Sequence, residues 1–223
     1  MTGIQPQPQE LQQAIGLFRE HFFEPATGTF DPEGVHHEFN QGLHGRKVDF
    51  DAVLEGTDLY DRWVDVTVAA IAQRYSQKLL GNSVLIGVAN GTNRLARDVA
   101  TSLDCDVAAL DTVKLGKGII NLTPESVSML QEINPEMAVI TEDIATRGTN
   151  GASVVLSTRH NAPKRLKRIE VINTLERSIP ERLDELDVVY HSLIVAHMID
   201  YEPERCAAEG YCADGWELIP YGH

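Results

Sequence analysis

The stretch from Ala138 to Ser153, AVITEDIATRGTNGAS, combines residue types that can bind a phosphorylated sugar. A short apolar run leads into two acids, Glu142 and Asp143. Adjacent carboxylates are costly to bury, but at the end of a strand they can accept hydrogen bonds from two hydroxyls or hold a cation. Residues 146–151 then offer hydroxyls and backbone N–H groups at a helix start, which favour an anion. Two acids that can bind a diol, next to a loop that can bind a phosphate, indicate a sugar phosphate as the ligand.

Alternating strands and helices must position these residues. Apolar runs predict buried strands at 83–89, 136–141 and 168–176, and 106–115 is strand-like. Helical patterns occupy 91–103, 122–133 and 151–161, while 187–198 fits a strand and also a helix. Such alternation predicts an α/β fold with a parallel sheet covered on both faces. Ligands of such sheets bind at the carboxyl ends of the strands, where Glu142 and Asp143 are expected.

The N-terminal part has a different character. Residues 1–9 are polar, 10–23 form an amphipathic pattern, and 24–45 are rich in Gly, Pro and Asp, which predicts turns. A long helix is expected over 56–81. We predict one domain over 1–223, with a small N-terminal hood at about 10–55, a core at 56–200 and a C-terminal tail at 201–223.

The composition limits the classes of function. The net charge of -14 argues against nucleic-acid binding, which needs a basic surface. No apolar run reaches the roughly 18 residues of a membrane span. The N-terminus lacks the pattern of a signal peptide, and three cysteines are too few for a disulfide framework. We therefore expect a cytoplasmic protein with reduced thiols.

The segment AVITEDIATRGTN resembles the phosphoribosyl pyrophosphate (PRPP) motif of the type I phosphoribosyltransferases. The resemblance implies a Rossmann-like central parallel sheet flanked by helices. It implies that Glu142 and Asp143 bind the ribose hydroxyls. The loop that would hold the 5-phosphate comprises Thr146, Arg147, Gly148, Thr149 and Asn150, although Arg147 also fits a plain surface residue.

A second segment, VLIGVANGTNRLA at 84–96, looks like the pyrophosphate loop of the same family. By this resemblance Ala89, Asn90 and Gly91 offer backbone N–H groups to the pyrophosphate. Gly91 permits a close approach of the backbone.

A third segment, LHGRKVDFDAV at 43–53, resembles orotate phosphoribosyltransferases through Gly45, Arg46, Phe50 and Asp51. It departs from their pattern at Leu43 and His44. The resemblance implies transfer of ribose 5-phosphate from PRPP to orotate, giving orotidine 5'-monophosphate for pyrimidine biosynthesis. It also implies a homodimer.

The mobile catalytic loop of orotate enzymes carries several lysines and a histidine, whereas residues 112–130 supply only Lys114 and Lys117. We expect Lys114, Lys117 and Asp143 to be the catalytic residues, with Arg46 assisting at the pyrophosphate. Mg²⁺ is the expected cofactor, held mainly by the substrate, with Asp143 as the candidate protein ligand.

Two rival functions remain open. One is a phosphoribosyltransferase for a purine or another base. The other is a PRPP- or nucleotide-sensing protein that kept the fold and lost efficient catalysis, which the sparse loop at 112–122 favours.

Other chemical residues receive plainer interpretations. His36–His37 reads as a surface pair, and Cys206 and Cys212 have no matching Cys/His pair near them in the chain, so neither predicts a zinc site. The basic run 164–168 reads as a solvated helix or loop end, or as a contact to a partner subunit.

Overall fold

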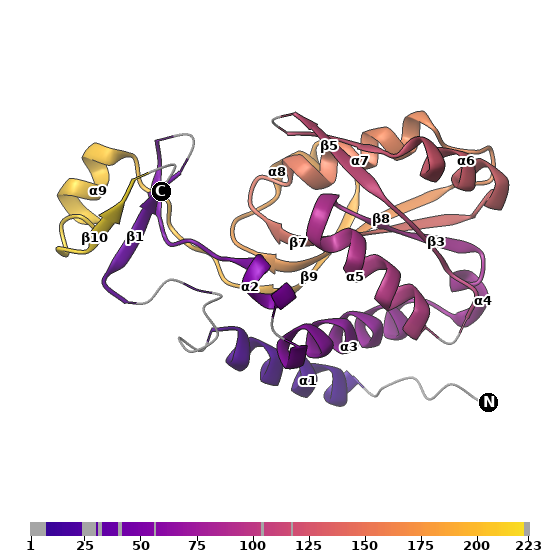
Figure 1. Ribbon diagram of the computed structural model, residues 1–223, viewed down its shortest axis with the longest axis horizontal. Coiled ribbons are helices and arrows are strands. Elements are labelled where there is room, and N and C mark those ends of the chain that lie inside the picture. The colour runs from indigo at the N-terminus through magenta and orange to yellow at the C-terminus, as the bar shows by residue number, and fades with distance from the viewer. Residues whose placement is uncertain are drawn as a thin grey trace.

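The computed structural model describes residues 8–23, 30, 33–39, 42–55, 57–103, 105–116 and 118–220. Its centre is a five-stranded sheet in which every neighbouring pair is parallel. The strand order is β4 (Ala108–Leu110), β3 (Ser83–Gly87), β7 (Met137–Ala145), β8 (Arg168–Glu176) and β9 (Val189–Val195). This confirms the predicted fold class and settles 187–198 as a strand region (Figure 1).

Helices cover both faces of this sheet, as its doubly apolar strands require. One face packs against α1 (Pro8–Phe22), α3 (Thr57–Arg74) and α5 (Ala89–Ser102), in a core that contains Phe18, Trp63 and Val139. The other face packs against α6 (Pro124–Ile133) and α7 (Thr149–His160), through a second core that contains Ile140 and Val154. Because side chains alternate along a strand, the neighbours Val139 and Ile140 serve opposite cores.

Short helices complete the described core. They are α2 (Phe50–Glu55), α4 (Gln77–Leu80) after the long helix α3, and α8 (Glu181–Asp184) before β9. None of the described helices is long and apolar enough to span a bilayer.

The strand-like stretch 106–115 is two strands rather than one. After β4 the chain leaves the sheet at Asp111, and β5 (Thr112–Gly116) turns back as an antiparallel hairpin with β6 (Ile119–Leu122). The prediction was wrong here because its apolar residues do not share one environment. Leu110 is buried in the core, whereas Leu115 is 64% exposed.

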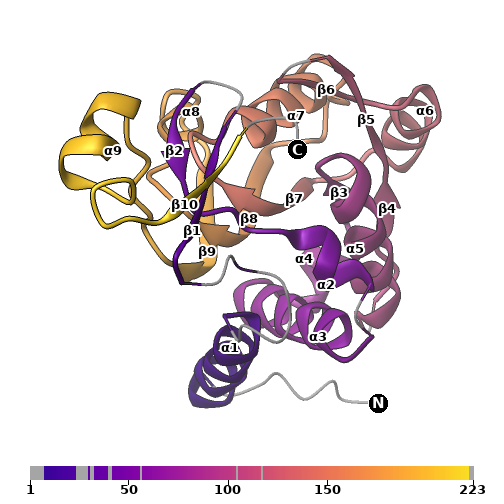
Figure 2. The same cartoon turned by 60° about the vertical axis from the view of Figure 1, so that its left-hand side comes forward.

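Segments from both ends of the chain build a separate small unit. Strand β1 (Val35–Glu38) forms an antiparallel pair with β2 (His44–Gly45) and a parallel pair with β10 (Glu217–Ile219). Helix α9 (Pro203–Glu209) lies beside these strands (Figure 1). We call this unit, residues 33–49 and 199–220, the terminal subdomain. Figures 1 and 2 show it at one end of the molecule, next to the core.

Candidate functional site

The two acids of the PRPP-like motif lie within strand β7, which continues to Ala145 because β8 pairs with it along its whole length. Glu142 is only 2% exposed and lies beneath the start of α7, since a Cβ on Gly151 would be 2.7 Å from Glu142 Oε2. Asp143 is half-buried, and its Oδ1 accepts a hydrogen bond of 2.7 Å from the N–H of Ile144. The two carboxyl groups therefore point to opposite faces of the sheet.

Burial gives Glu142 an unusual pKa. Loss of hydration and then the charge of Asp143 raise the pKa of Glu142 to about 8, while the backbone N–H of Gly151 offsets part of the rise. At neutral pH the folded protein therefore holds this carboxyl mainly in its protonated form.

A polar neighbour of Glu142 was missed by the sequence reasoning. Asn173 of β8 pairs in register with Glu142 and is fully buried. Neither polar atom of its side-chain amide has a hydrogen-bond partner among the described residues. The signal in the sequence was a lone Asn inside the apolar strand RIEVINTLE, at the strand next to the acid pair.

The predicted phosphate loop leads directly into α7. Gly148 is the N-cap residue with φ +69, and no side chain caps the helix there. The first intrahelical bond runs from Ala152 N to Gly148 O, so the N–H groups at 149 and 150 lack helical acceptors and can face an anion, whereas that of Gly151 faces the Glu142 carboxyl. Thr146, Arg147, Thr149 and Asn150 are all exposed around this end.

Helix α8 fixes the shape of this loop. The N–H of Arg182 donates to the carbonyl of Arg147 at 3.1 Å. A Cβ on Gly148 would lie 2.9 Å from Pro180 Cβ, so both its positive φ and the close contact require glycine.

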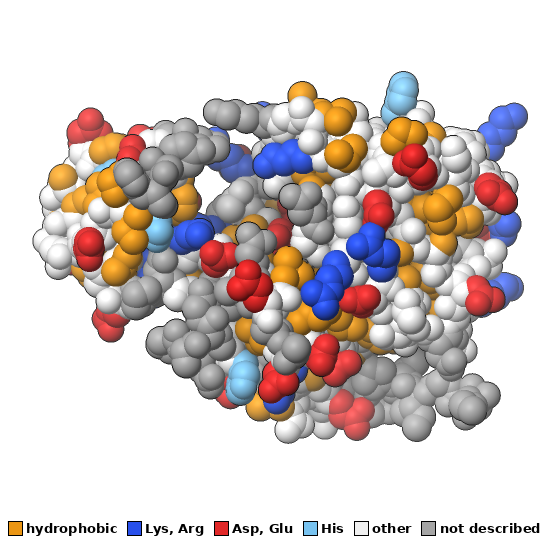
Figure 3. Space-filling view, viewed as in Figure 1, with side chains coloured by type: hydrophobic (Ala, Val, Ile, Leu, Met, Phe, Trp, Pro, Cys, Tyr) orange, Lys and Arg blue, Asp and Glu red, His pale blue; other side chains and the backbone are white. Residues whose placement is uncertain are grey.

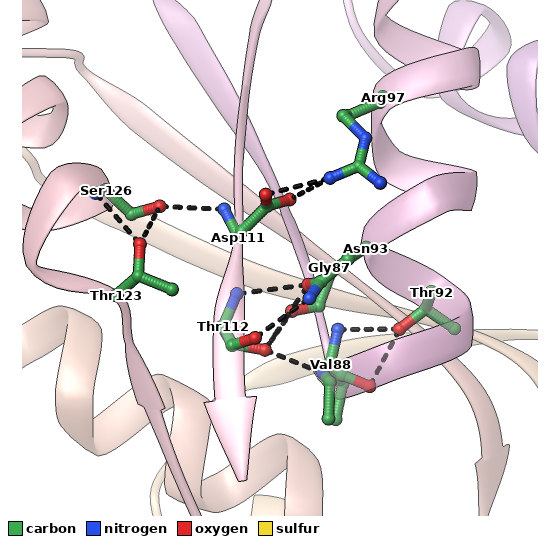
Figure 4. Close-up of polar contacts among 10 residues, drawn as sticks. Gly87, Val88, Thr92, Asn93, Arg97, Asp111, Thr112, Thr123 and Ser126 are labelled. Carbon is green, nitrogen blue, oxygen red and sulfur yellow. Dashed lines mark hydrogen bonds and ion pairs between the residues drawn. The ribbon is translucent and has the colours of Figure 1, made fainter.

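The second predicted loop joins β3 to α5 and is tied to the hairpin through Thr112 (Figure 4). Thr112 Oγ1 donates to the carbonyl of Gly87 at 2.7 Å and accepts the N–H of Ala89 at 2.6 Å. Asn93 completes the link, because its side chain bonds both the N–H and the carbonyl of Thr112. The bend is tight: a Cβ on Gly87 would collide with the backbone of Thr92 and Asn93.

These contacts limit the backbone N–H groups that the predicted pyrophosphate loop can offer. Ala89 adopts φ +52, which is unusual for a residue with a side chain, and its N–H already bonds Thr112. Asn90 and Gly91 follow it in the first turn of α5, and the N-cap residue Val88 makes no side-chain cap hydrogen bond. A Cβ on Gly91 would come within 2.9 Å of Leu54 Cδ1. The described side chains do not include that of Asn90.

The segment predicted to form the catalytic loop folds as the β5–β6 hairpin. At its base, the Asp111 carboxylate pairs with Arg97 at 2.7 Å and the Asp111 N–H donates to Ser126 Oγ at 2.8 Å (Figure 4). At its far end, a Cβ on Gly118 would lie 3.3 Å from the Thr149 side chain, so the turn lies at the start of α7. Lys114 is exposed on β5, and Lys117 lies outside the described residues.

Hydrogen bonds attach this hairpin to α7. The N–H of Ile120 donates to Ser153 Oγ at 2.9 Å, and the N–H of Leu122 donates to Ser157 Oγ at 3.0 Å. The structure thus brings Lys114, the predicted phosphate loop and the acid strand to one edge of the sheet.

Arg46 lies in the terminal subdomain. Its guanidinium stacks 3.8 Å from the centre of the Phe30 ring and 5.5 Å from that of Trp216. The subdomain meets the core where Arg177, just after β8, pairs with Asp200. Figure 3 shows the molecular surface hollowed between the subdomain and the core, with both basic and acidic side chains around the hollow.

No family model matches this sequence, and no curated protein matches it. The fold has solved counterparts. Orotate phosphoribosyltransferase from Aeropyrum pernix superposes with a TM-score of 0.54 at 18% identity, covering 83% of this chain and 93% of that one. The Mycobacterium tuberculosis orotate enzyme in complex with PRPP gives 0.54 at 14% identity, covering 83% and 95%.

An adenine enzyme matches equally well. Adenine phosphoribosyltransferase from Trypanosoma brucei, in complex with AMP, pyrophosphate and ribose-5-phosphate, gives a TM-score of 0.54 at 11% identity, covering 80% of this chain and 79% of that one. The chain therefore has the fold of the type I phosphoribosyltransferases, which orotate and adenine enzymes share.

Proposed function

We propose that this protein transfers ribose 5-phosphate from PRPP to a nucleobase and releases pyrophosphate. One observation carries the proposal. Helices α5 and α7, whose N-cap residues make no side-chain cap hydrogen bond, start at the carboxyl ends of the neighbouring strands β3 and β7, and the acids Glu142 and Asp143 lie near the same end of β7. This arrangement suits a molecule with a phosphate at one end, a diphosphate at the other and a diol between them.

The proposed roles follow from this geometry. The N–H groups at the start of α7, with Thr146, Arg147 and Thr149 around them, receive the 5-phosphate. The start of α5 at Asn90 and Gly91 receives the pyrophosphate. Asp143 is the more accessible acid and meets the ribose hydroxyls, whereas Glu142 reaches them only when the α7 N-terminus moves off it.

The reaction breaks the bond from the anomeric carbon to the pyrophosphate oxygen and forms a bond from that carbon to a nitrogen of the base. The protein holds both reactants in line and stabilises the charge of the leaving pyrophosphate. Lys114 and Lys117 of the hairpin region supply positive charge, and Arg46 adds to it if the terminal subdomain closes over the site.

Mg²⁺ belongs to this proposal. Its preferred ligands are oxygens, and Asp143 offers a carboxylate at the strand end. Because Glu142 is buried and mainly protonated, most of the ligands must come from PRPP and water. The bound ion neutralises charge on the pyrophosphate, while the chain's own residues orient the ribose.

Orotate is the base that we propose, on the likeness of Gly45, Arg46, Phe50 and Asp51 to the orotate branch. The same likeness underlies a proposed homodimer, and the three scattered cysteines, too few for a disulfide framework, underlie the proposed cytoplasmic location. A PRPP sensor is the second candidate. The hydrogen bonds from the hairpin to Ser153 and Ser157 of α7 favour it, because they restrict the movement that would close the hairpin over a substrate.

The test measures pyrophosphate release from PRPP and Mg²⁺ with orotate, adenine, hypoxanthine, guanine and uracil offered separately. Pyrophosphate release with orotate alone supports the full proposal. Release with another base supports the phosphoribosyl transfer but contradicts orotate as the base. PRPP binding without release, measured by calorimetry, favours the sensor.

A pair of variants locates the binding site. Asp143→Asn should weaken PRPP binding, while Asp184→Asn, which removes an exposed carboxylate on α8, should leave it unchanged. Equal PRPP affinity in Asp143→Asn and the unmodified protein would remove the acid strand from the site.

A further inference from the structure

Four potential metal ligands meet inside the terminal subdomain. They are His36, His44, Cys206 and Cys212, and their ligand atoms all lie within 4.8 Å of one another. The interpretation of His36 as a surface residue was therefore wrong, because its side chain is fully buried in this cluster. It failed because 170 residues separate His36 from Cys206 along the chain, so no local spacing indicates the cluster.

The local fold explains why these side chains converge. Glu38 pairs with His44 in the antiparallel β1–β2 ladder, so His36, two residues before Glu38, shares a face with His44. Cys206 lies on α9, and the turn after that helix brings back Cys212, whose N–H donates to Cys206 Sγ at 3.3 Å. His37 points to the other face of the strand.

The distances within the cluster match a tetrahedral metal site. His36 Nε2 lies 3.2 Å from Cys212 Sγ and 3.9 Å from Cys206 Sγ, and His44 Nδ1 lies 3.4 Å from Cys212 Sγ. Zinc bonds of about 2.3 Å to sulfur and about 2.0 Å to nitrogen give tetrahedron edges of roughly 3.3–3.8 Å.

Few side chains of the subdomain are buried, although aromatic rings such as Tyr211 and Trp216 pack against one another on it. Among its described residues, the buried ones are His36, His44, Gly45, Cys206 and Gly210. Three of these five are members of the cluster, and Cys206 is the only apolar one. A unit this small, without an apolar core, commonly depends on a structural metal or a disulfide.

We propose that His36, His44, Cys206 and Cys212 bind one structural Zn²⁺ ion that fastens the C-terminal tail to strands β1 and β2. Two neutral imidazoles and two thiolates balance the charge of the ion, which makes its burial feasible. Four protein ligands leave no open position, so the site is structural and not catalytic. The soft sulfur ligands select zinc over magnesium or calcium.

The test uses the full chain, reduced and freed of metal, with Co²⁺ and then Zn²⁺ as probes. We expect the spectrum of tetrahedral Co²⁺ with a thiolate charge-transfer band, and displacement of cobalt by a single equivalent of zinc. An octahedral spectrum, or a Cys206–Cys212 disulfide in the protein with no zinc uptake under reducing conditions, would overturn the proposal.

Matched variants assign the ligands. His36→Ala and Cys212→Ser should each weaken zinc binding by more than about 100-fold, since even loss of an outer-shell partner costs about 10–100-fold. His37→Ala and Cys105→Ser are the controls and should bind zinc as the unmodified chain does. Because a ligand variant can fail to fold, circular dichroism of each variant accompanies the titration, and the cobalt spectrum of the unmodified chain decides independently. Unchanged zinc affinity in a folded Cys212→Ser would contradict the assignment.

Discussion

Replacing Glu142 with glutamine probes the buried carboxyl beneath α7. Glutamine has nearly the size of a protonated glutamic acid and, like it, carries an acceptor oxygen and a donor, but it cannot ionise. The variant should be indistinguishable from the unmodified protein at acidic pH and more stable than it at alkaline pH. The reason is that folding buries this carboxyl beside Asp143, where its charged form is disfavoured.

The sign and size follow from the two pKa values. The pKa of Glu142 rises from 4.5 to about 8 on folding, so between these values the folded chain keeps a proton that the unfolded chain has released. The free energy of unfolding therefore falls as pH rises, by up to about 1.4 kcal/mol per pH unit. Above about pH 8 the free energy of unfolding has lost its full contribution from the protonated carboxyl, at most about 5 kcal/mol. Relaxation of the protein around the charged carboxylate makes this loss smaller.

The assay is urea unfolding followed by circular dichroism at several pH values from 5.5 to 9, at fixed zinc content. The difference between Glu142→Gln and the unmodified protein should grow with pH and level off above about 8. Taking the difference removes the contributions of other titrating groups, such as His191. Glu132→Gln, on the exposed surface of α6, is the control and should give a flat difference. A flat difference for Glu142→Gln as well would refute the burial of this carboxyl.

Three further changes test the loops around the site. Gly148→Ala should lower the free energy of unfolding by at least about 1–2 kcal/mol, because residue 148 has a positive φ. Gly16→Ala, in the open interior of α1, is the control and should raise the free energy of unfolding by up to about 1 kcal/mol. An unchanged stability of Gly148→Ala in urea unfolding would contradict this prediction. Thr112→Val should lower the free energy of unfolding by about 1–3 kcal/mol for each group that it leaves unpaired, namely the Gly87 carbonyl and the Ala89 N–H. Thr112→Ser keeps the hydroxyl and should lower it much less, and thermal unfolding can distinguish the two variants. The double variant Ser153→Ala and Ser157→Ala should speed amide hydrogen exchange at Ile120 and Leu122, by about tenfold for each 1.4 kcal/mol of local stability lost. Ser128→Ala, at an exposed serine, is the control. Equal exchange rates in the two variants would mean that the hydroxyls of Ser153 and Ser157 do not hold the hairpin.

Much of the frame could be predicted from the sequence because it depends on local patterns. Runs such as VLIG and AVIT are apolar on both sides, which is how a strand in a covered parallel sheet must look. The start of α6 was equally readable: Thr123 caps the helix through the N–H of Ser126, with Pro124 in the first turn. The acid pair and the glycine-containing loop after it were also visible, since a strand end and a helix start are adjacent in the chain.

Local patterns in the chain thus predict the α/β architecture and indicate the PRPP-like loops at Ala89–Gly91 and Thr146–Asn150. The continuation of β7 through Glu142 and Asp143 could not be predicted in this way, because it depends on pairing with β8, which keeps them in the strand with their carboxyl groups on opposite faces. The tertiary structure also shows that Thr112 bonds Ala89, and that His36 and His44 meet Cys206 and Cys212. The physical reason is the same in each case. Burial and long-range contacts arise between segments that are far apart along the chain, and a local pattern records only the neighbours of a residue in sequence.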